Sequence, residues 1–240
     1  MPRAIVALLI LATLSACSDD PTTPDPVDFT ITGSVTDADG NPVPNALVLL
    51  DLPFTHTLKS ALPATTVLQL NLPDPDHVRL DILSHCGTDT FTTLEMDLPA
   101  GLHHIPVESV DRAGRQLTDQ VMRAIFTTST GTDERPLSLQ RNIGNDGGDY
   151  AQWNHAHIQD HVRIQAITND DGWYTITDPC LGFGSVFPLI GENGLIIGEA
   201  SIPWQVRAWA YHPDYPEGTP SSWQAINQDT GGTAFIVVGE

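Results

Sequence analysis

The stretch Phe29 to Leu50, FTITGSVTDADGNPVPNALVLL, indicates the fold more directly than any other part of the chain. In residues 29–36, apolar or small residues alternate with threonine and serine, which is typical of a strand with one buried face. Residues 37–41 supply turn chemistry, because Gly40 tolerates a positive φ and the neighbouring Asp and Asn side chains can bond local amides. The alternation resumes at residues 46–50. We therefore predict a hairpin of two strands, whose acidic residues form the turn rather than a calcium loop.

The same stretch carries the motif G-x-V-x-D-x-x-G-x-P-V-x-x-A-x-V-x-L, formed by Gly33, Val35, Asp37, Gly40, Pro42, Val43, Ala46, Val48 and Leu50. This motif resembles the carboxypeptidase regulatory-like domain, which implies a small transthyretin-like β-sandwich. A second part of the family pattern, T-x-x-D-G-x-Y, is matched by Thr168, Asp171, Gly172 and Tyr174. Later strands are predicted at residues 204–211 and 233–238. The resemblance therefore assigns residues 28–58 and 138–240 to one sandwich that is interrupted by the residues between them.

The intervening residues contain short alternating strands about ten residues apart, each bounded by Gly, Pro or Asp, which is typical of an all-β sandwich. The matching positions are Thr66, Leu72, Pro73, Val78, Leu80, Ile82, Gly87, Leu94, Leu98–Gly101, His103, Asp111, Gly114 and Val121. They resemble the immunoglobulin-like domain of the flagellar hook-capping protein, which implies a structural or spacer role. We assign residues 59–137 to this inserted module, and we interpret residues 127–154 as a long polar loop. The predicted fold is all-β: two β-sandwich modules, the second inserted into a loop of the first.

The N-terminus has the parts of a secretory signal, namely a positive start at Arg3, an apolar run over residues 4–14 and small residues before Cys17. The ending Leu-Ser-Ala-Cys resembles a bacterial lipobox, which implies that residues 1–16 are a signal peptide and that Cys17 is lipidated. Acyl chains on Cys17 would make the membrane a partner. Residues 17–27 then form an extended, Pro-rich tether. Because Ser18 follows the cysteine, we expect the outer membrane or cell surface of a Gram-negative bacterium.

The chain is strongly acidic, with 30 Asp and Glu against 10 Lys and Arg and a net charge of −20. Such a surface repels nucleic acids and anionic lipid headgroups, so we expect no nucleic-acid partner. No P-loop, dinucleotide fingerprint, GxSxG elbow or SxxK motif occurs in the sequence. We therefore expect a protein that is not an enzyme and needs no cofactor.

One segment concentrates metal-ligating residue types, with His155, His157, Asp160 and His161 in the sequence HAHIQDH. In a strand, His155 and His157 would share a face, whereas in a helix His157 and His161 would. Neutral imidazoles at such spacing suit zinc, copper or nickel, with Asp160 as a ligand or as the hydrogen-bond partner of one. Ordinary polar loop histidines are the alternative, and no HExxH motif is present. A divalent metal is therefore a candidate cofactor of this segment.

Trp209 and Tyr211 share one face of the strand predicted at residues 204–211. If this face points outward, the two rings are a candidate ligand platform that stacks on a sugar ring. If it points inward, they belong to the core or to packing between the modules, where large aromatic side chains are common.

Two cysteines, Cys86 and Cys180, remain after lipidation of Cys17. An exported protein can pair its cysteines, provided that their Cα atoms approach within about 7 Å. Because Cys86 and Cys180 fall in different predicted modules, a disulfide between them would join the insert to the split sandwich.

Both resemblances are to accessory modules. The expected function is that of a non-catalytic, lipid-anchored protein of the cell envelope, a structural or interaction module with envelope proteins or glycans as partners. One alternative is a carbohydrate- or ligand-binding lipoprotein that uses exposed aromatic side chains. The other is a metal-binding protein that uses His155, His157 and His161.

Overall fold

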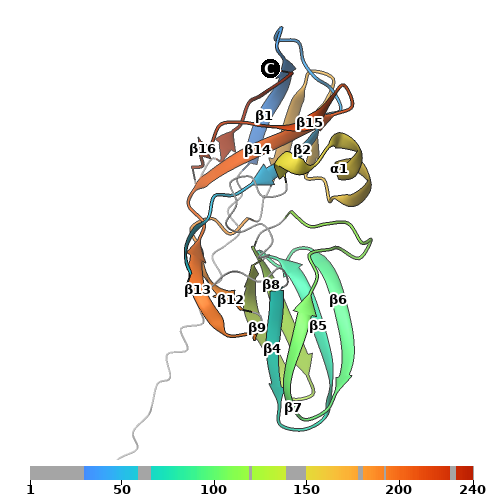
Figure 1. Cartoon of the computed structure of the whole chain (residues 1–240), viewed down its shortest axis with the longest axis vertical. Coiled ribbons are helices and arrows are strands. Elements are labelled where there is room, and N and C mark those ends of the chain that lie inside the picture. Colours follow the sequence, from blue (N-terminus) through green and yellow to red (C-terminus); the bar gives the residue numbers. More distant parts are fainter. Residues whose placement is uncertain are drawn as a thin grey trace, which may run out of the picture.

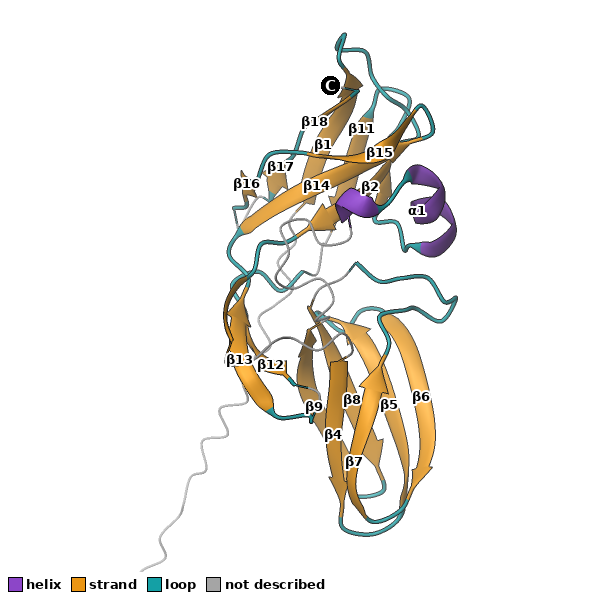
Figure 2. Ribbon diagram, viewed as in Figure 1, coloured by secondary structure: helices purple, strands orange, loops and turns teal. Residues whose placement is uncertain are grey.

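The computed structural model describes residues 30–58, 66–118, 121–138, 150–177, 181–191, 193–227 and 231–239. Strands dominate these residues, and α1 (His155–His161) is the α-helix among them. The prediction of an all-β fold built from packed sheets is therefore confirmed. Figure 2 shows the strands in two large groups at the two ends of an elongated molecule, with α1 beside the group that holds β1 and β2.

The first group consists of two sheets that enclose a common apolar core. One sheet contains β1 (Thr30–Asp37), β11 (Trp173–Thr177), β17 (Gly232–Thr233) and β18 (Ile236–Val238). The other contains β2 (Leu47–Asp51), β10 (Ala166–Ile167), β14 (Gln205–His212), β15 (Tyr215–Pro220) and β16 (Gln224–Ala225). Segments from both ends of the sequence thus complete the same pair of sheets (Figure 1).

The turn at residues 37–41 forms as predicted, since Asp37 Oδ1 accepts hydrogen bonds from the amides of Asp39 at 3.0 Å and Asn41 at 2.8 Å. Gly40 takes the positive φ of 83° that the turn requires. The predicted hairpin is wrong, however, because β1 pairs with β11, β17 and β18, whereas β2 pairs with β10 and β14. The chain therefore crosses from one sheet to the other after Val43. As a result β2 is buried on both faces, by the shared core on one side and by α1 on the other.

The side chain of Thr168 stabilises the segment in which the chain passes from one sheet to the other. Its buried hydroxyl accepts a hydrogen bond from the amide of Ala46 at 2.8 Å and donates one to the carbonyl of Val43 at 2.7 Å. The two backbone groups lie between strands and have no ladder partner of their own, so the hydroxyl meets the hydrogen-bonding requirement of buried backbone. The threonine of the T-x-x-D-G-x-Y pattern thus stabilises the segment that carries the first motif.

The second group contains a two-stranded sheet of β4 (Thr66–Leu72) and β7 (Gly101–Val107). Facing it is a four-stranded sheet of β5 (Asp76–Ser84), β6 (Thr90–Leu98), β8 (Val121–Thr128) and β9 (Gly131–Ser138). Alternating residues of these strands enclose a separate apolar core. Among the described strands, β4–β9 pair only with one another. The assignment of residues 59–137 to an inserted module agrees with this pairing and stays a prediction.

Interpreting residues 127–154 as a long loop was wrong, because β9 pairs with β8 along its whole length. Most of β9 is exposed, and its sequence GTDERPLS has no apolar alternation. An edge strand with charged residues and a proline lacks the signal on which strand prediction depends.

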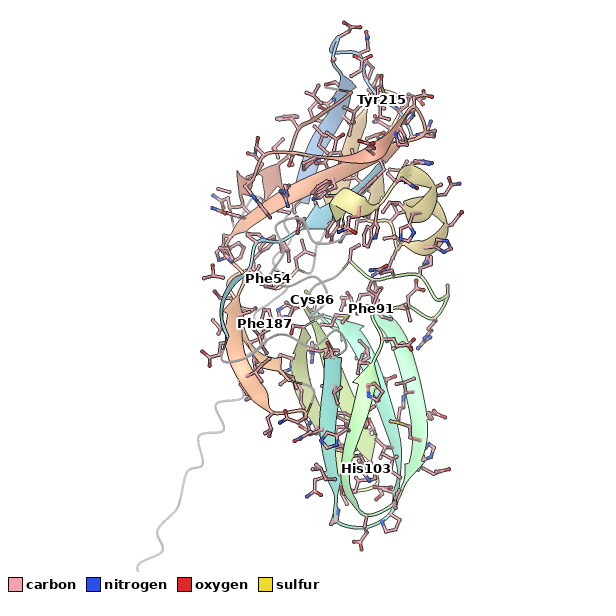
Figure 3. The ribbon with its side chains drawn as sticks, viewed as in Figure 1. Phe54, Cys86, Phe91, His103, Phe187 and Tyr215 are labelled. Carbon is pink, nitrogen blue, oxygen red and sulfur yellow. The ribbon has the colours of Figure 1, made fainter. Side chains whose placement is uncertain are left out.

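A third sheet lies beside the second group and has the order β12–β13–β3. It is formed by β3 (Thr55–Leu58), β12 (Val186–Ile190) and β13 (Ile196–Ser201). Strand β12 contacts both β9 and β4. In Figure 3, Phe54 and Phe187 lie next to each other between the two groups, with ring centroids 5.8 Å apart in an edge-to-face arrangement. This sheet therefore extends the first group along the side of the second.

Candidate functional site

Two aromatic rings lie exposed on the outer face of the sheet that contains β1. Trp173 on β11 is 48% exposed and Phe235, just before β18, is 57% exposed. Their ring centroids are 6.1 Å apart and their planes meet at 80°, the edge-to-face geometry that aromatic pairs favour. Val237 on β18 is also exposed. We call Trp173, Phe235 and Val237 the aromatic face.

Strand register explains why these side chains gather. Trp173 lies opposite Ser34 in the antiparallel pair of β1 and β11, and Val237 lies beside Thr36 in the parallel pair of β1 and β18. The neighbouring residues Tyr174 and Ile236 point into the core. Because successive strand residues alternate between the two faces of a sheet, Trp173, Phe235 and Val237 must all point outward.

Hydroxyl side chains surround the aromatic face. The same outer surface presents Thr32, Ser34, Thr36, Thr175 and Thr233, all partly or fully exposed. Within the described ranges, none of these five hydroxyls hydrogen-bonds to another protein group. The four strands of this sheet carry a single charged residue, Asp37, at the end of β1. Its hydrogen bonds with Asn41 hold the pKa of the Asp37 carboxyl below its usual value, so that it stays negative.

The histidine segment forms α1, which the side chain of Asn154 caps by accepting a hydrogen bond from the amide of His157 at 2.9 Å. The helix brings the rings of His157 and His161 to a centroid distance of 5.2 Å, and His157 also packs on Trp153 at 5.5 Å. Burial, then the nearby His212, lowers the pKa of His155. No group of three or more His, Cys, Asp or Glu side chains in the described part of the chain is arranged to hold a metal ion.

The four candidate ligands His155, His157, Asp160 and His161 are all described, and no three of them are grouped to hold a metal ion; of the two pairings foreseen, the helix brings His157 and His161 together. The physical reason is that the helix is short and packs one side against the sheet, so His157 acts as a packing residue. Sequence reasoning left a strand, a helix and a loop open for this segment, although the Asn154 cap before it was a usable helix signal.

The candidate platform of Trp209 and Tyr211 is also corrected. Trp209 is only 4% exposed and Tyr211 is fully buried, because α1 and the 3-10 turn η2 (Tyr150–Gln152) cover this face of β14. Trp209 stacks on Tyr150 with centroids 6.0 Å apart, and the Tyr211 hydroxyl donates to the carbonyl of Tyr150 at 2.7 Å. Both rings are therefore core residues, but of a second apolar cluster on the face of β14 that points away from the shared core.

A buried ion pair lies beside this second core. Arg207 and Asp51 approach to 2.6 Å, with side chains 13% and 6% exposed, and Trp209 Nε1 donates to the same carboxylate oxygen at 3.3 Å. The guanidinium of Arg207 also lies over the rings of Trp209 and Trp223, 5.0 and 4.4 Å from their centroids. These contacts satisfy a charge that burial would otherwise penalise, which indicates a structural role.

The two groups of strands are joined at several points. Arg163 pairs with Asp89 at 2.7 Å and lies over the ring of Phe91, 4.7 Å from its centroid. The backbone amide of Gln116 donates a hydrogen bond to the carbonyl of His161 at 2.7 Å, and its carbonyl accepts one from the amide of Arg163 at 2.9 Å. Elsewhere the carbonyl of Asn193 contacts the side chains of Gln69 and His104. We call this set of contacts the joint.

Cys86 lies at the end of the second group that faces the first, close to Phe91 (Figure 3). It is disulfide-bonded. Cys180 lies outside the described residues, so its pairing with Cys86 stays a prediction. The lipidation site Cys17 also lies outside the described residues.

Sequence reasoning missed Trp173 and Phe235 as site residues. A signal was present, since the pattern match places Tyr174 in the core and Trp173 is its neighbour in a strand. For Phe235, the signal was the alternation at residues 233–238.

No family model matches the chain, and no curated protein or solved structure matches it significantly. Within the described ranges, no helix is long and apolar enough to cross a membrane.

Proposed function

We propose that this chain is a non-catalytic, lipid-anchored protein of the cell envelope that presents the aromatic face to a ligand. The single observation that carries the proposal is the exposure of Trp173 and Phe235 side by side on a sheet surface. Apolar side chains that gather on a protein surface mark binding sites, and aromatic residues are enriched in such sites.

The joint supports a scaffold role. Its charged, cation–π and backbone contacts connect the two groups of strands at separate places, and β12 adds contacts with β9 and β4. A body tied at several points holds a binding face at a fixed distance and orientation from its anchor. The lipobox resemblance at Cys17 supplies the anchor, and the Pro-rich tether supplies the spacing.

The proposal is tested by retention of the chain on isolated Gram-negative cell envelopes. We expect the double variant Trp173→Ala/Phe235→Ala to lose retention. Leu102→Ala is the matched control, because Leu102 is also apolar and exposed but lies on β7 in the second group. Equal retention of the double variant and the wild type would contradict the proposal.

The anchor is tested separately by membrane fractionation after expression in a Gram-negative host. We expect Cys17→Ala to move the chain from the membrane fraction to the soluble fraction.

The non-catalytic assignment would be contradicted if the chain hydrolysed any substrate and a point substitution in the chain abolished that hydrolysis.

A further inference from the structure

We infer that the ligand of the aromatic face is an uncharged polysaccharide. Trp173 and Phe235 pack against the C–H faces of its sugar rings, and the surrounding serine and threonine hydroxyls bond to the sugar hydroxyls. This inference rests on the proposed function, because it names the chemical class of the ligand for the same surface.

The rings give the first argument. A sugar ring is amphipathic, with C–H groups on its faces and hydroxyls on its rim, and an aromatic ring packs well on such a C–H face. Trp173 and Phe235 each keep about half of their surface exposed, and their planes differ by 80°. The pair therefore offers apolar surfaces in two directions, which suits consecutive sugar units that are rotated relative to each other.

The hydroxyls give the second argument. Ser34 lies directly between the two aromatic positions in the sheet, opposite Trp173 and one residue before the Val35–Ile236 pair. Thr32 and Thr175 pair with each other on the same face. A hydroxyl can both donate and accept a hydrogen bond, as a sugar hydroxyl does. Five such groups, with no hydrogen-bond partner among the described residues, surround the rings and match the polar rim of a sugar.

Charge gives the third argument. The four strands of this sheet, all of them described, contain no basic residue to pair with phosphate, sulfate or carboxylate groups. The chain as a whole carries −20, and Asp170 and Asp171 lie exposed in the turn before β11. Anionic polymers and anionic membrane surfaces are therefore repelled. A neutral ligand avoids this repulsion.

Size separates a glycan from a protein partner. A stable protein interface buries about 800 Å² on each side, with an apolar centre and a polar rim. The aromatic face has three exposed apolar side chains surrounded by hydroxyl groups. Its apolar area is therefore too small and too interrupted to form the apolar centre of a protein interface. It is large enough for one or two sugar rings.

The test is binding of the purified full-length chain to immobilised cellulose, chitin, starch and mannan, with alginate and heparin as anionic controls. We expect saturable binding to at least one neutral polysaccharide. Trp173→Ala and Phe235→Ala should each raise Kd about tenfold or more, Trp173→Phe should have a smaller effect, and Leu102→Ala none. Ser34→Asp should also weaken binding by placing a charge between the rings. Melting temperatures verify that each variant is folded.

Binding only to alginate or heparin, or equal affinity of the wild type and the ring variants, would overturn the inference. Failure to bind any neutral polysaccharide would also overturn it. A separate outcome would bear on the proposed function. If retention on cell envelopes depends on both rings but survives enzymatic removal of the glycans, the glycan inference is refuted while the proposed interaction face is retained. Dimerisation through the face, seen by sedimentation and abolished by Trp173→Ala, would refute the glycan as well.

Discussion

The hydroxyl of Tyr174 donates a hydrogen bond to the carbonyl of Ala234 at 2.7 Å, across the strand position of Gly33. A Cβ atom on Gly33 would lie 1.8 Å from that carbonyl oxygen, so only glycine fits between β11 and the segment before β18. Tyr174 and Ala234 immediately neighbour Trp173 and Phe235. The same contact that closes the core on one face therefore fixes the distance between the two exposed rings on the other.

Replacing Tyr174 by phenylalanine leaves the buried carbonyl of Ala234 without this donor. We expect Tyr174→Phe to lower the free energy of unfolding by about 1–3 kcal/mol, the usual loss for an unsatisfied buried group. Urea denaturation measures the effect. Thr175→Val is the control, because Thr175 points outward and its substitution should change the free energy by less than about 0.5 kcal/mol. A neutral effect of Tyr174→Phe would show that the bond is not made.

Burial raises the pKa of both Tyr174 and Tyr211 above the ordinary value of 10.0. Above that value the unfolded chain loses these protons while the folded chain keeps them, so stability present below pH 10 is lost as the pH rises further. We expect the free energy of unfolding to fall as the pH rises above 10. Tyr211→Phe should make this decrease shallower, whereas Trp173→Phe should leave it unchanged.

The pKa of the His85 imidazole is lowered, first by burial and then by the nearby Arg123. Below the ordinary value of 6.5 the unfolded chain takes up a proton more readily than the folded chain, so this group destabilises the fold as the pH falls. We expect His85→Gln to lessen the loss of stability between pH 7 and 5. His77 is the matched contrast, because its hydrogen bond with Asp97 raises its pKa and His77→Gln should act in the opposite sense.

The buried pair of Asp51 and Arg207 should be sensitive to the loss of one partner. We expect Asp51→Asn to destabilise the fold by about 3 kcal/mol, because the guanidinium then lies buried without a counter-charge. The double variant Asp51→Leu/Arg207→Met should be less destabilised than Asp51→Asn, which leaves the guanidinium of Arg207 without its counter-charge. Asp97→Asn, at the exposed pair with His77, should have a much smaller effect on the free energy of unfolding. Equal effects at the two sites would contradict a structural role for the buried pair.

Arg163 should control how firmly the two groups of strands are held together. We expect Arg163→Ala to have a small effect on global stability, since the ion pair with Asp89 is partly exposed. Amide hydrogen exchange at Arg163 and Gln116 should nevertheless accelerate, because these amides hydrogen-bond across the joint. The variant Asp89→Asn removes the ion pair but keeps the packing of Arg163 on Phe91, so it distinguishes the two contributions. Unchanged exchange in both variants would show that the joint does not depend on this side chain.

The fold class and many strand positions were predictable because alternation and turn chemistry are local properties. The turn at residues 37–41 and strand β11 are examples. Two of the failures also have local causes: β9 is an exposed edge strand with little apolar alternation, and α1 has only seven residues.

The sequence by itself determined that the chain is all-β, that residues 37–41 turn, and that Trp173 and Tyr174 point to opposite faces, since each of these follows from residue type and spacing. Only the tertiary structure decided that β1 and β2 lie in different sheets and that α1 buries Trp209 and Tyr211. It also brought Phe235 beside Trp173. The reason is that strand pairing and burial depend on partners far away in the sequence, which no local pattern identifies.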